Sequence, residues 1–395
     1  MDEKKKVPKL RFPGFTDDWE QRKLDAAAKF SKGNGYSKRD LIESGTPIIL
    51  YGRLYTKYET SISDVDTYVE AKEGSIYSKG GEVIVPASGE TADDIARAAT
   101  IDKSGILLGG DLNVVMPNED INPAFLAISI SNGNSQRELA KKAQGKSVVH
   151  IHNEDIGNLI VPFPTKAEQN KIVDYFSNID NLITLHQRKL QHIKDFKKAM
   201  LQKMFPKKGE KYPEIRFPEF TDAWEQRKFF NIAIRESTVL ASSSDVPNVE
   251  YEDVVAEEGR LNKDISLKVT DKSGIAFDGS QVLYGKLRPY LHNWLNPDFK
   301  GVAVGDWWVL KPIEMNKNFL YCLIQTQQFD NIANQSAGSK MPRADWNLIS
   351  NSVFMVPTLK EEQSKIGNYF NELDNLITLH PVSYTHLRAH ETEAD

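Results

Sequence analysis

Residues 166–205 read KAEQNKIVDYFSNIDNLITLHQRKLQHIKDFKKAMLQKMF, a stretch with neither glycine nor proline. Its apolar side chains repeat with heptad spacing, which predicts one long helix with a seam for a partner helix. The seam positions include Phe176, Ile179, Ile183, His186, Leu190 and Ile193. At about 1.5 Å per residue the helix is about 60 Å long, more than a small domain encloses. We therefore expect a spacer with one partner face.

A partner for this helix is present in the same chain. Residues 167–186 recur at 361–380 with 13 of 20 positions identical, an offset of 361 − 167 = 194. The second copy supplies the seam positions Phe370, Leu373, Ile377 and His380. Residues 8–24, PKLRFPGFTDDWEQRKL, recur at 213–229 with 12 of 17 identical, an offset of 213 − 8 = 205. The chain is a tandem duplication, and we expect the two helices to pack together. The alternative is two independent domains on a helical linker.

The duplication divides the chain into seven parts. We expect an opening motif at 1–24, a first middle segment at 25–164, a long helix at 165–206, a repeated opening motif at 207–230, a second middle segment at 231–357, a second helix at 358–380 and a tail at 381–395. The opening motifs repeat Phe12, Phe15 and Trp19, which we interpret as an anchor on a neighbouring surface rather than a ligand cage. Both middle segments are rich in short β-type runs and glycine, and GDLNVVMP at 110–117 matches GDWWVLKP at 305–312. Elsewhere the two segments diverge, as expected of two readers of different targets.

Composition narrows the class of protein. A chain of 395 residues with a net charge of −5 is long enough for two cores and is not basic overall. A single cysteine, Cys322, excludes a disulfide framework and suits a reducing cytoplasm. No apolar run approaches the roughly 18 residues that span a bilayer, so we expect a cytoplasmic protein with no membrane partner.

The two repeated motifs resemble the specificity subunit of Type I restriction-modification systems. The resemblance rests on PxxRFPxFxDxWEQRKL and on EQxKIxxYFxxxDNLITLH, and it covers the chain to about His380. It implies an α+β fold, in which two similar mixed α/β target recognition domains are separated by two long antiparallel coiled-coil helices with pseudo-two-fold symmetry. It also implies that each domain reads half of a split asymmetric site in double-stranded DNA.

The same resemblance implies partners and a non-catalytic role. The helices would dock two modification (methyltransferase) subunits, with restriction (translocase and nuclease) subunits joining outside. S-adenosylmethionine, ATP and Mg would be used by those partners, and we expect no cofactor and no metal site in this chain. The residues agree: a phosphate loop would need glycine where Ala140 stands, and no methyltransferase motif is found.

The middle segments carry residue types that read bases. Arg and Lys suit guanine, and Asn or Gln suit adenine. The DNA-contacting candidates are Tyr51, Arg53, Tyr55, Lys57, Ser88, Glu90, Thr91, Arg97, Lys146 and Ser147 in the first segment, and Lys286, Arg288, Tyr290, Asn293, Lys340 and Arg343 in the second. A protein-interaction scaffold with two diverged binding domains on a helical ruler is the alternative function. Loss of DNA binding on mutating Arg288 would discriminate between them.

The C-terminal residues depart from the repeat. After His380 the chain reads PVSYTHLRAHETEAD, in which the heptads disappear. Pro381 predicts the end of the second helix, which would then be about half as long as the first. We interpret residues 381–395 as an aberrant tail without a functional role.

Overall fold

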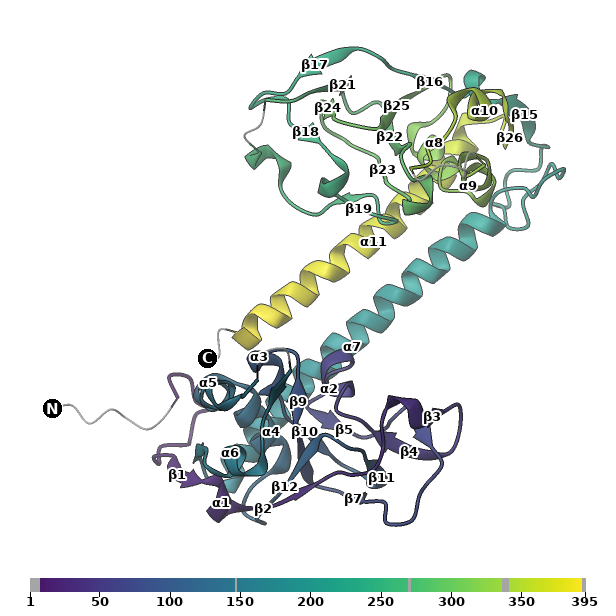
Figure 1. Cartoon of the computed structure of the whole chain (residues 1–395). Helices are drawn as coiled ribbons and strands as arrows, with labels where there is room; N and C mark the ends of the chain where they lie inside the picture. Colours follow the sequence, from purple (N-terminus) through teal and green to yellow (C-terminus); the bar gives the residue numbers. More distant parts are fainter. Residues whose placement is uncertain (1–7, 146–147, 269–270, 336–340, 393–395) are drawn as a thin grey trace. The chain divides into compact units, whose positions relative to one another are not determined.

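The computed structural model describes residues 8–145, 148–268, 271–335 and 341–392 (Figure 1). The chain divides into unit 1, Met1–Leu182 with Ala389–Asp395, and unit 2, Ile183–Arg388. The division falls inside helix α7 (Lys166–Lys203), so each unit includes part of that helix. Each unit combines sheets with short helices. Among the described residues, no helix has both the length and the apolar character that crossing a bilayer requires.

Unit 1 contains sheets of order β2-β12-β8-β10-β5 and β3-β6-β4-β11-β7, with the pairs β1-β14 and β13-β9. The strands are β1 (Glu20–Lys23), β2 (Ala28–Lys32), β3 (Leu41–Ile42), β4 (Thr46–Ile49), β5 (Ser61–Ile62), β6 (Tyr68–Val69), β7 (Tyr77–Lys79), β8 (Glu82–Pro86), β9 (Ser88–Gly89), β10 (Ala99–Ile101), β11 (Ser104–Leu108), β12 (Leu112–Pro117), β13 (Val149–His150) and β14 (Ile160–Phe163). The helices before α7 are α1 (Leu24–Ala27), η1 (Lys38–Asp40), α2 (Arg53–Thr56), α3 (Ala92–Ile95), α4 (Pro123–Ser131), α5 (Gly133–Lys142) and α6 (Asn153–Gly157).

Unit 2 contains sheets of order β16-β25-β22-β23 and β17-β21-β24-β18, with the pairs β15-β26 and β19-β20. The strands are β15 (Glu225–Lys228), β16 (Ala233–Arg235), β17 (Val239–Ala241), β18 (Asn248–Val249), β19 (Val254–Val255), β20 (Arg260–Leu261), β21 (Ser273–Phe277), β22 (Val282–Gly285), β23 (Trp294–Leu295), β24 (Gly301–Ala303), β25 (Trp307–Pro312) and β26 (Val353–Val356). The helices are η2 (Phe229–Asn231), η3 (Tyr251–Asp253), η4 (Ile265–Leu267), η5 (Pro289–Leu291), α8 (Lys317–Leu323), α9 (Gln327–Ala333), α10 (Trp346–Asn351) and α11 (Lys360–Thr392).

The two units share an antiparallel frame that is buried on both faces. In unit 1, β12 lies between β2 and β8, and in unit 2, β25 lies between β16 and β22. Successive strand residues point to opposite faces, so Val83 and Val85 join one hydrophobic cluster while Ile84 joins another. Val282 and Leu283 divide between two clusters in the same way. Double burial explains why these strands are continuous apolar runs rather than alternating ones.

Each opening motif is held to the first turn of a long helix by a buried ion pair. In unit 1 the Arg11 guanidinium donates to both carboxylate oxygens of Glu168, at 2.6 and 2.7 Å. In unit 2 Arg216 donates to Glu362 at 2.7 and 2.8 Å. Both carboxylates are only 1% exposed. A forked arginine on a buried carboxylate fixes the mutual orientation of the two segments.

A glutamine follows each of these carboxylates and joins the helix to the middle segment that precedes it. Gln169 accepts from the Asn122 backbone N–H at 2.8 Å and donates to the Pro164 carbonyl at 2.9 Å. Gln363 makes the same contacts with Asn316 and Pro357, at 3.0 Å each. The repeated Glu-Gln pair therefore fixes each middle segment to the start of its own helix.

The prediction that the aromatic residues of the opening motif form an anchor is confirmed. Trp19 packs edge to face on Phe125, with ring centroids 5.9 Å apart, and Trp224 packs on Phe319 at the same separation. Phe12 contacts Tyr175 on α7. The EQRK residues of each motif form β1 and β15, which pair with β14 and β26, the strands that lead into the long helices.

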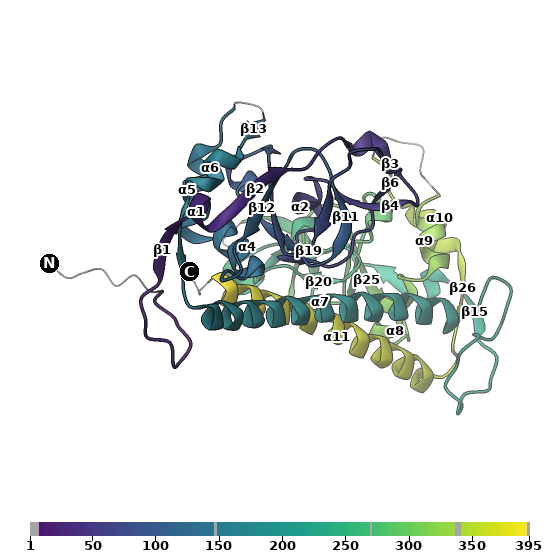
Figure 2. The ribbon, with the colours of Figure 1, turned by 90° about the horizontal axis from the view of Figure 1, so that it is seen from below.

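The seam of the long helices is their covered face. Ile179, Phe370, Leu373 and Ile377 are buried, Phe176, Ile183, His186, Leu190 and Ile193 are half-buried, and the side chain of His380 lies outside the described part. Within unit 2, the end of α7 and the first half of α11 lie antiparallel in one hydrophobic cluster (Figures 1 and 2). Lys197 pairs with Asp374 at 2.6 Å in this contact. Such a buried polar pair favours one register of the two helices.

The second long helix does not end where the sequence predicted. Helix α11 runs from Lys360 to Thr392, so it continues through Pro381, and the expected stop at His380 is wrong. The proline ring fixes φ near −65°, a helical value, so the helix can continue although the ring removes one backbone N–H donor and crowds the carbonyl four residues earlier. The predicted 381–395 tail is therefore helical as far as Thr392.

Candidate nucleic-acid interface

Four of the predicted DNA-contacting residues, Lys286, Arg288, Tyr290 and Asn293, lie on the loop between β22 and β23. We call residues 286–293 the reading loop. It contains the short helix η5, and the residues at the two ends of η5, Arg288 and His292, have φ values of 48° and 52°. Non-glycine residues rarely adopt this left-handed conformation, and such outliers cluster at functional sites. The backbone here is held by its surroundings rather than by local preference.

A second segment, distant in sequence, holds the start of the reading loop. Leu287 and Arg343 form a β-bridge, in which the Arg288 N–H donates to the Pro342 carbonyl at 2.8 Å. The Ala344 N–H donates to the Lys286 carbonyl, also at 2.8 Å. The structure thus brings Arg343 beside Lys286 and Arg288, from which it is separated by more than 50 residues of sequence. Lys340 lies outside the described residues.

Asp306 organises the cations at this edge. The Arg343 guanidinium contacts both Asp306 carboxylate oxygens, at 3.0 and 3.2 Å, and the Lys286 ammonium is 3.5 Å from the same carboxylate. The hydrogen bond from Arg343 is the main cause that lowers the pKa of Asp306. Arg288 is exposed and forms no ion pair with any described residue. Of these three cations, Arg288 is therefore the one that no described carboxylate pairs with.

The two remaining candidates of the reading loop have different surroundings. Tyr290 is 52% exposed, so its ring and hydroxyl are accessible. Asn293 is 7% exposed, and its backbone carbonyl accepts from the Gly285 N–H at 2.8 Å. Asn293 therefore belongs to the base of the loop rather than to its accessible surface.

In unit 1 the equivalent position follows β8, where Ser88 lies beside the segment that precedes α6. Strand β9 pairs with β13, and the Ser88 hydroxyl is 3.2 Å from Nδ1 of His150. The Tyr55 hydroxyl donates to the Ser88 carbonyl at 2.8 Å, and the Tyr51 ring packs on Tyr55. Burial raises the pKa of Tyr55, so its hydroxyl remains a donor. Lys146 and Ser147 lie outside the described residues.

The next residues of unit 1 shape a short helix. The Thr91 hydroxyl caps α3 by accepting from the Asp94 N–H at 3.1 Å, a helix-capping role. Arg97 is 3.4 Å from the Asp94 carboxylate and lies near the ring of Tyr58. Glu90 is exposed. Of this group, Glu90 and Arg97 have accessible side chains, whereas Thr91 is engaged by the backbone.

Arg53 and Lys57 are engaged by carboxylates within unit 1. Arg53 is only 8% exposed and contacts Glu59 at 2.6 Å and Asp66 at 2.8 Å. Lys57 contacts Asp66 at 3.1 Å. The prediction grouped these cations with Tyr51 and Tyr55 because all four lie on one short segment. The structure separates them, since the Tyr55 hydroxyl contacts the Ser88 carbonyl whereas Arg53 and Lys57 contact Glu59 and Asp66.

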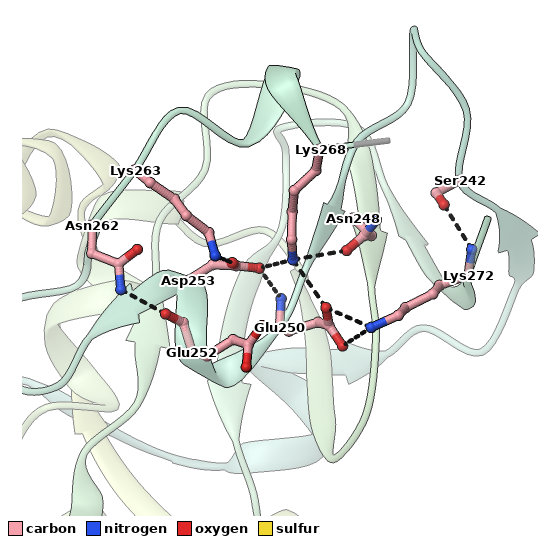
Figure 3. Close-up of polar contacts among 9 residues, drawn as sticks. All are labelled: Ser242, Asn248, Glu250, Glu252, Asp253, Asn262, Lys263, Lys268 and Lys272. Carbon is pink, nitrogen blue, oxygen red and sulfur yellow. Dashed lines mark hydrogen bonds and ion pairs between the residues drawn. The ribbon is translucent and has the colours of Figure 1, made fainter. Parts of the chain in front are cut away.

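Unit 2 also contains a lysine network that the sequence analysis missed (Figure 3). Asp253 is fully buried and contacts the ammonium groups of Lys263 at 2.9 Å and Lys268 at 2.6 Å. Glu250 contacts Lys268 at 2.9 Å and Lys272 at 2.7 Å. The lysines recur at intervals of five and four residues, but the acidic partners are too far away in sequence to be inferred. The network joins the segment before β21, which carries the three lysines, to the segment of η3, which carries the two carboxylates.

This network predicts acid sensitivity of unit 2. The contact with Lys272 is the main cause that lowers the pKa of Glu250. Burial alone would raise the pKa of Asp253, but Lys263 and Lys268 lower it below its ordinary value of 3.8. A carboxylate with a lowered pKa stabilises the fold above its unfolded pKa and loses that effect as the pH falls. We expect Asp253→Asn to lower the free energy of unfolding by about 2 kcal/mol at pH 7 and by less near pH 3. Thermal unfolding measures this, with the exposed Asp245→Asn as control; equal effects of the two changes would contradict it.

The two units share one arrangement of strands and differ in the side chains of the equivalent loop. These features are those of a recognition protein with two binding units. Residues 16–195 match the family model described as Type I restriction modification DNA specificity domain. The Type I restriction enzyme MjaVIII specificity subunit of Methanocaldococcus jannaschii is 22% identical over 396 residues, covering 95% of this chain and 90% of that protein. The Type I restriction enzyme EcoDI specificity subunit of Escherichia coli is 21% identical over 257 residues, 57% of each chain.

Solved structures share the fold over nearly the whole length. The Type I restriction-modification S subunit from M. genitalium superimposes with a TM-score of 0.59 at 13% identity, covering 98% of this chain and 97% of that one. A chain from a study of complex assembly and conformational transition of the type I R-M system superimposes with a TM-score of 0.56 at the same identity and coverage. Over nearly its whole length the chain is similar in sequence to Type I restriction-modification specificity subunits, and it shares the fold of the solved ones.

Proposed function

We propose that this chain directs a Type I restriction-modification enzyme to a split asymmetric DNA site, each unit reading one half of it. The proposal rests on one comparison between the two units. Strands β8 and β22 pair in the same way with β12 and β25, and the segments that follow β8 and β22 carry different side chains. The frame strands are equivalent, but the polar side chains at this position include the exposed Glu90 and the half-buried Arg97 in unit 1 and the exposed Arg288 and Tyr290 in unit 2. Different donors and acceptors on one frame would specify different bases.

The long helices offer equivalent surfaces for partners. Leu182 and Leu185 on α7 are 45% and 61% exposed, and their repeats Leu376 and Leu379 on α11 are 46% and 63% exposed. Exposed leucines at equivalent positions favour two copies of one partner. We assign these surfaces to two modification subunits, with restriction subunits joining the complex. S-adenosylmethionine, ATP and Mg would be bound by those partners, and the catalytic work would be theirs. A cytoplasmic location stays a prediction.

The test is to co-express the chain with its modification subunit and to map N6-methyladenine across the host genome by single-molecule sequencing. A split asymmetric motif methylated throughout the genome is the expected result. Absence of new methylation, with both subunits present and folded, would contradict the proposal. It would instead favour a scaffold whose two units each bind a protein.

Arg288 is the residue whose change discriminates best in this assay. It is exposed and forms no ion pair with any described residue, so Arg288→Ala removes a donor without leaving a buried charge. A specific arginine contact contributes about 1–3 kcal/mol to base discrimination. We expect the second half of the motif to become degenerate at one position or its methylation to be lost. Lys300→Ala, an exposed lysine of the same unit, is the control and leaves the motif unchanged.

A further inference from the structure

The segment after β8 in unit 1 and the segment after β22 in unit 2 are held by the same backbone contact, so their residues can be compared one by one. In unit 1 the Ala87 N–H donates to the Asp111 carbonyl at 2.8 Å, and in unit 2 the Lys286 N–H donates to the Asp306 carbonyl at 2.9 Å. Asp111 and Asp306 are the aspartates of the repeated motifs GDLNVVMP and GDWWVLKP. Ala87 is therefore the counterpart of Lys286, and the residues that follow them correspond in order.

The next residue of each segment pairs with a residue that is distant in sequence. Ser88 pairs with His150 in unit 1, where β9 meets β13, and Leu287 pairs with Arg343 in unit 2. Both pairs are antiparallel, and the partner residue lies three positions before the start of a short helix, α6 (153 − 150 = 3) or α10 (346 − 343 = 3). His150 therefore lies in unit 1 at the position that Arg343, a predicted DNA-contacting residue, holds in unit 2.

Unit 1 has no side chain at the position of Arg288. The counterpart of Arg288 is Gly89, one residue further along the segment. A Cβ atom at Gly89 would lie 2.9 Å from the Tyr55 hydroxyl and 3.0 Å from Cβ of Ile95, so a larger residue would force these neighbours to move. Base reading near Gly89 therefore depends on the side chains around it, and His150 is exposed on the strand that pairs with it.

The His150 ring is oriented by a buried serine. Its Nδ1 lies 3.2 Å from the Ser88 hydroxyl, and Ser88 is only 7% exposed. The Ser88 carbonyl accepts from the Tyr55 hydroxyl at 2.8 Å, which holds the serine in place. Since His150 is exposed and its Nδ1 is engaged with the serine, Nε2 is the ring nitrogen that can meet a ligand. It offers one directional hydrogen bond, as base edges require.

We propose that His150 is a specificity-determining residue of unit 1, whose Nε2 forms a hydrogen bond with a base edge in the first half of the split DNA site. The inference rests on the proposed function and adds the residue that reads from the position of Arg343. Arginine most often reads guanine through a fork of N–H groups, whereas an imidazole held at Nδ1 offers a single hydrogen bond. The same position of the two frames therefore selects bases by different chemistry.

The test is DNA binding by the complex of the full chain with its modification subunit. One duplex carries the methylated motif, and the others each have one base pair changed, at every specified position of both halves. Discrimination at a position is the ratio of the affinities for the motif and for the changed duplex. In His150→Ala we expect this ratio to fall about tenfold at one position of the first half, the size of one base contact. All other positions keep the wild-type ratio.

This readout separates base recognition from a structural role. An equal loss at every position of the first half would mean that His150 supports the fold or contacts a phosphate. Unchanged ratios, or a change in the second half, would mean that it reads no base of the first half. Each of these results overturns the inference and leaves the proposed function standing. Absence of any motif for the wild-type complex instead overturns the proposed function, and the inference with it.

Two further variants complete the test. Ser88→Ala removes the hydroxyl that orients the ring, so we expect a smaller fall at the same position and no further fall when it is combined with His150→Ala. Additive falls would contradict orientation of the ring by Ser88. His152→Ala is the matched control, an exposed histidine two residues along. It precedes α6 as Asp345 precedes α10, a helix-capping position, and we expect it to keep every wild-type ratio.

Discussion

Replacing Arg216 by alanine is expected to lower the free energy of unfolding of unit 2 by about 3–5 kcal/mol, the effect of leaving a buried charge without its partner. Glu362 is 1% exposed, and after the change it would keep one described hydrogen bond, from Nε1 of Trp224 at 3.0 Å. Calorimetric or chemical unfolding of the full chain measures the loss. Arg11→Ala, which removes the same contact from Glu168 in unit 1, is expected to have an effect of similar size.

A matched control lies on the adjoining strand. Arg227 contacts Glu225 at 2.6 Å, but both side chains are largely accessible, 29% and 41% exposed. Surface ion pairs contribute about 0–1 kcal/mol, so Arg227→Ala is expected to change stability little. Equal losses for Arg216→Ala and Arg227→Ala would mean that the repeated arginine does not hold the opening motif to the helix.

Exchanging one recognition domain is expected to change one half of the methylated motif completely and to leave the other half intact. The exchange replaces residues 231–357 by the corresponding segment of a family member with another motif, and the parallel exchange replaces residues 25–164. Each domain is joined to its helix by the same contacts, through Gln169 in unit 1 and Gln363 in unit 2. A segment that retains these contacts should be held in the same way.

Single-molecule sequencing of the host genome reads the result of both exchanges. The design should retain Glu258, which contacts Lys194 of α7 at 2.7 Å, and Gln325, which accepts from Lys197 at 2.7 Å. Without these residues a failure of folding would resemble a loss of recognition. An exchange that altered both halves of the motif would contradict the assignment of one half site to each unit.

The long helices and their repeats were predictable because they depend on local periodicity. The heptad spacing identified the covered face of α7, including Ile179 and Ile193. The same local reasoning failed at Pro381, since a proline weakens a helix without always ending it. Arg11 and Glu168 each belong to a repeated motif that the sequence reveals. Their contact, across 157 residues, appears only in the fold.

The sequence predicted which types of residue the candidate site contains, but it did not predict how these residues are arranged. The duplication, the spacer helices, the resemblance to Type I specificity subunits and the segment that carries Arg288 were predictable, because each is encoded by spacing or by repetition along the chain. The contact of Arg343 with Leu287, the carboxylates around Arg53 and the position of His292 between Glu257 and Asp330 appear only in the fold. The physical reason is that charges act through space. Whether a cation remains available to a ligand depends on which acidic groups the fold places within a few ångströms of it.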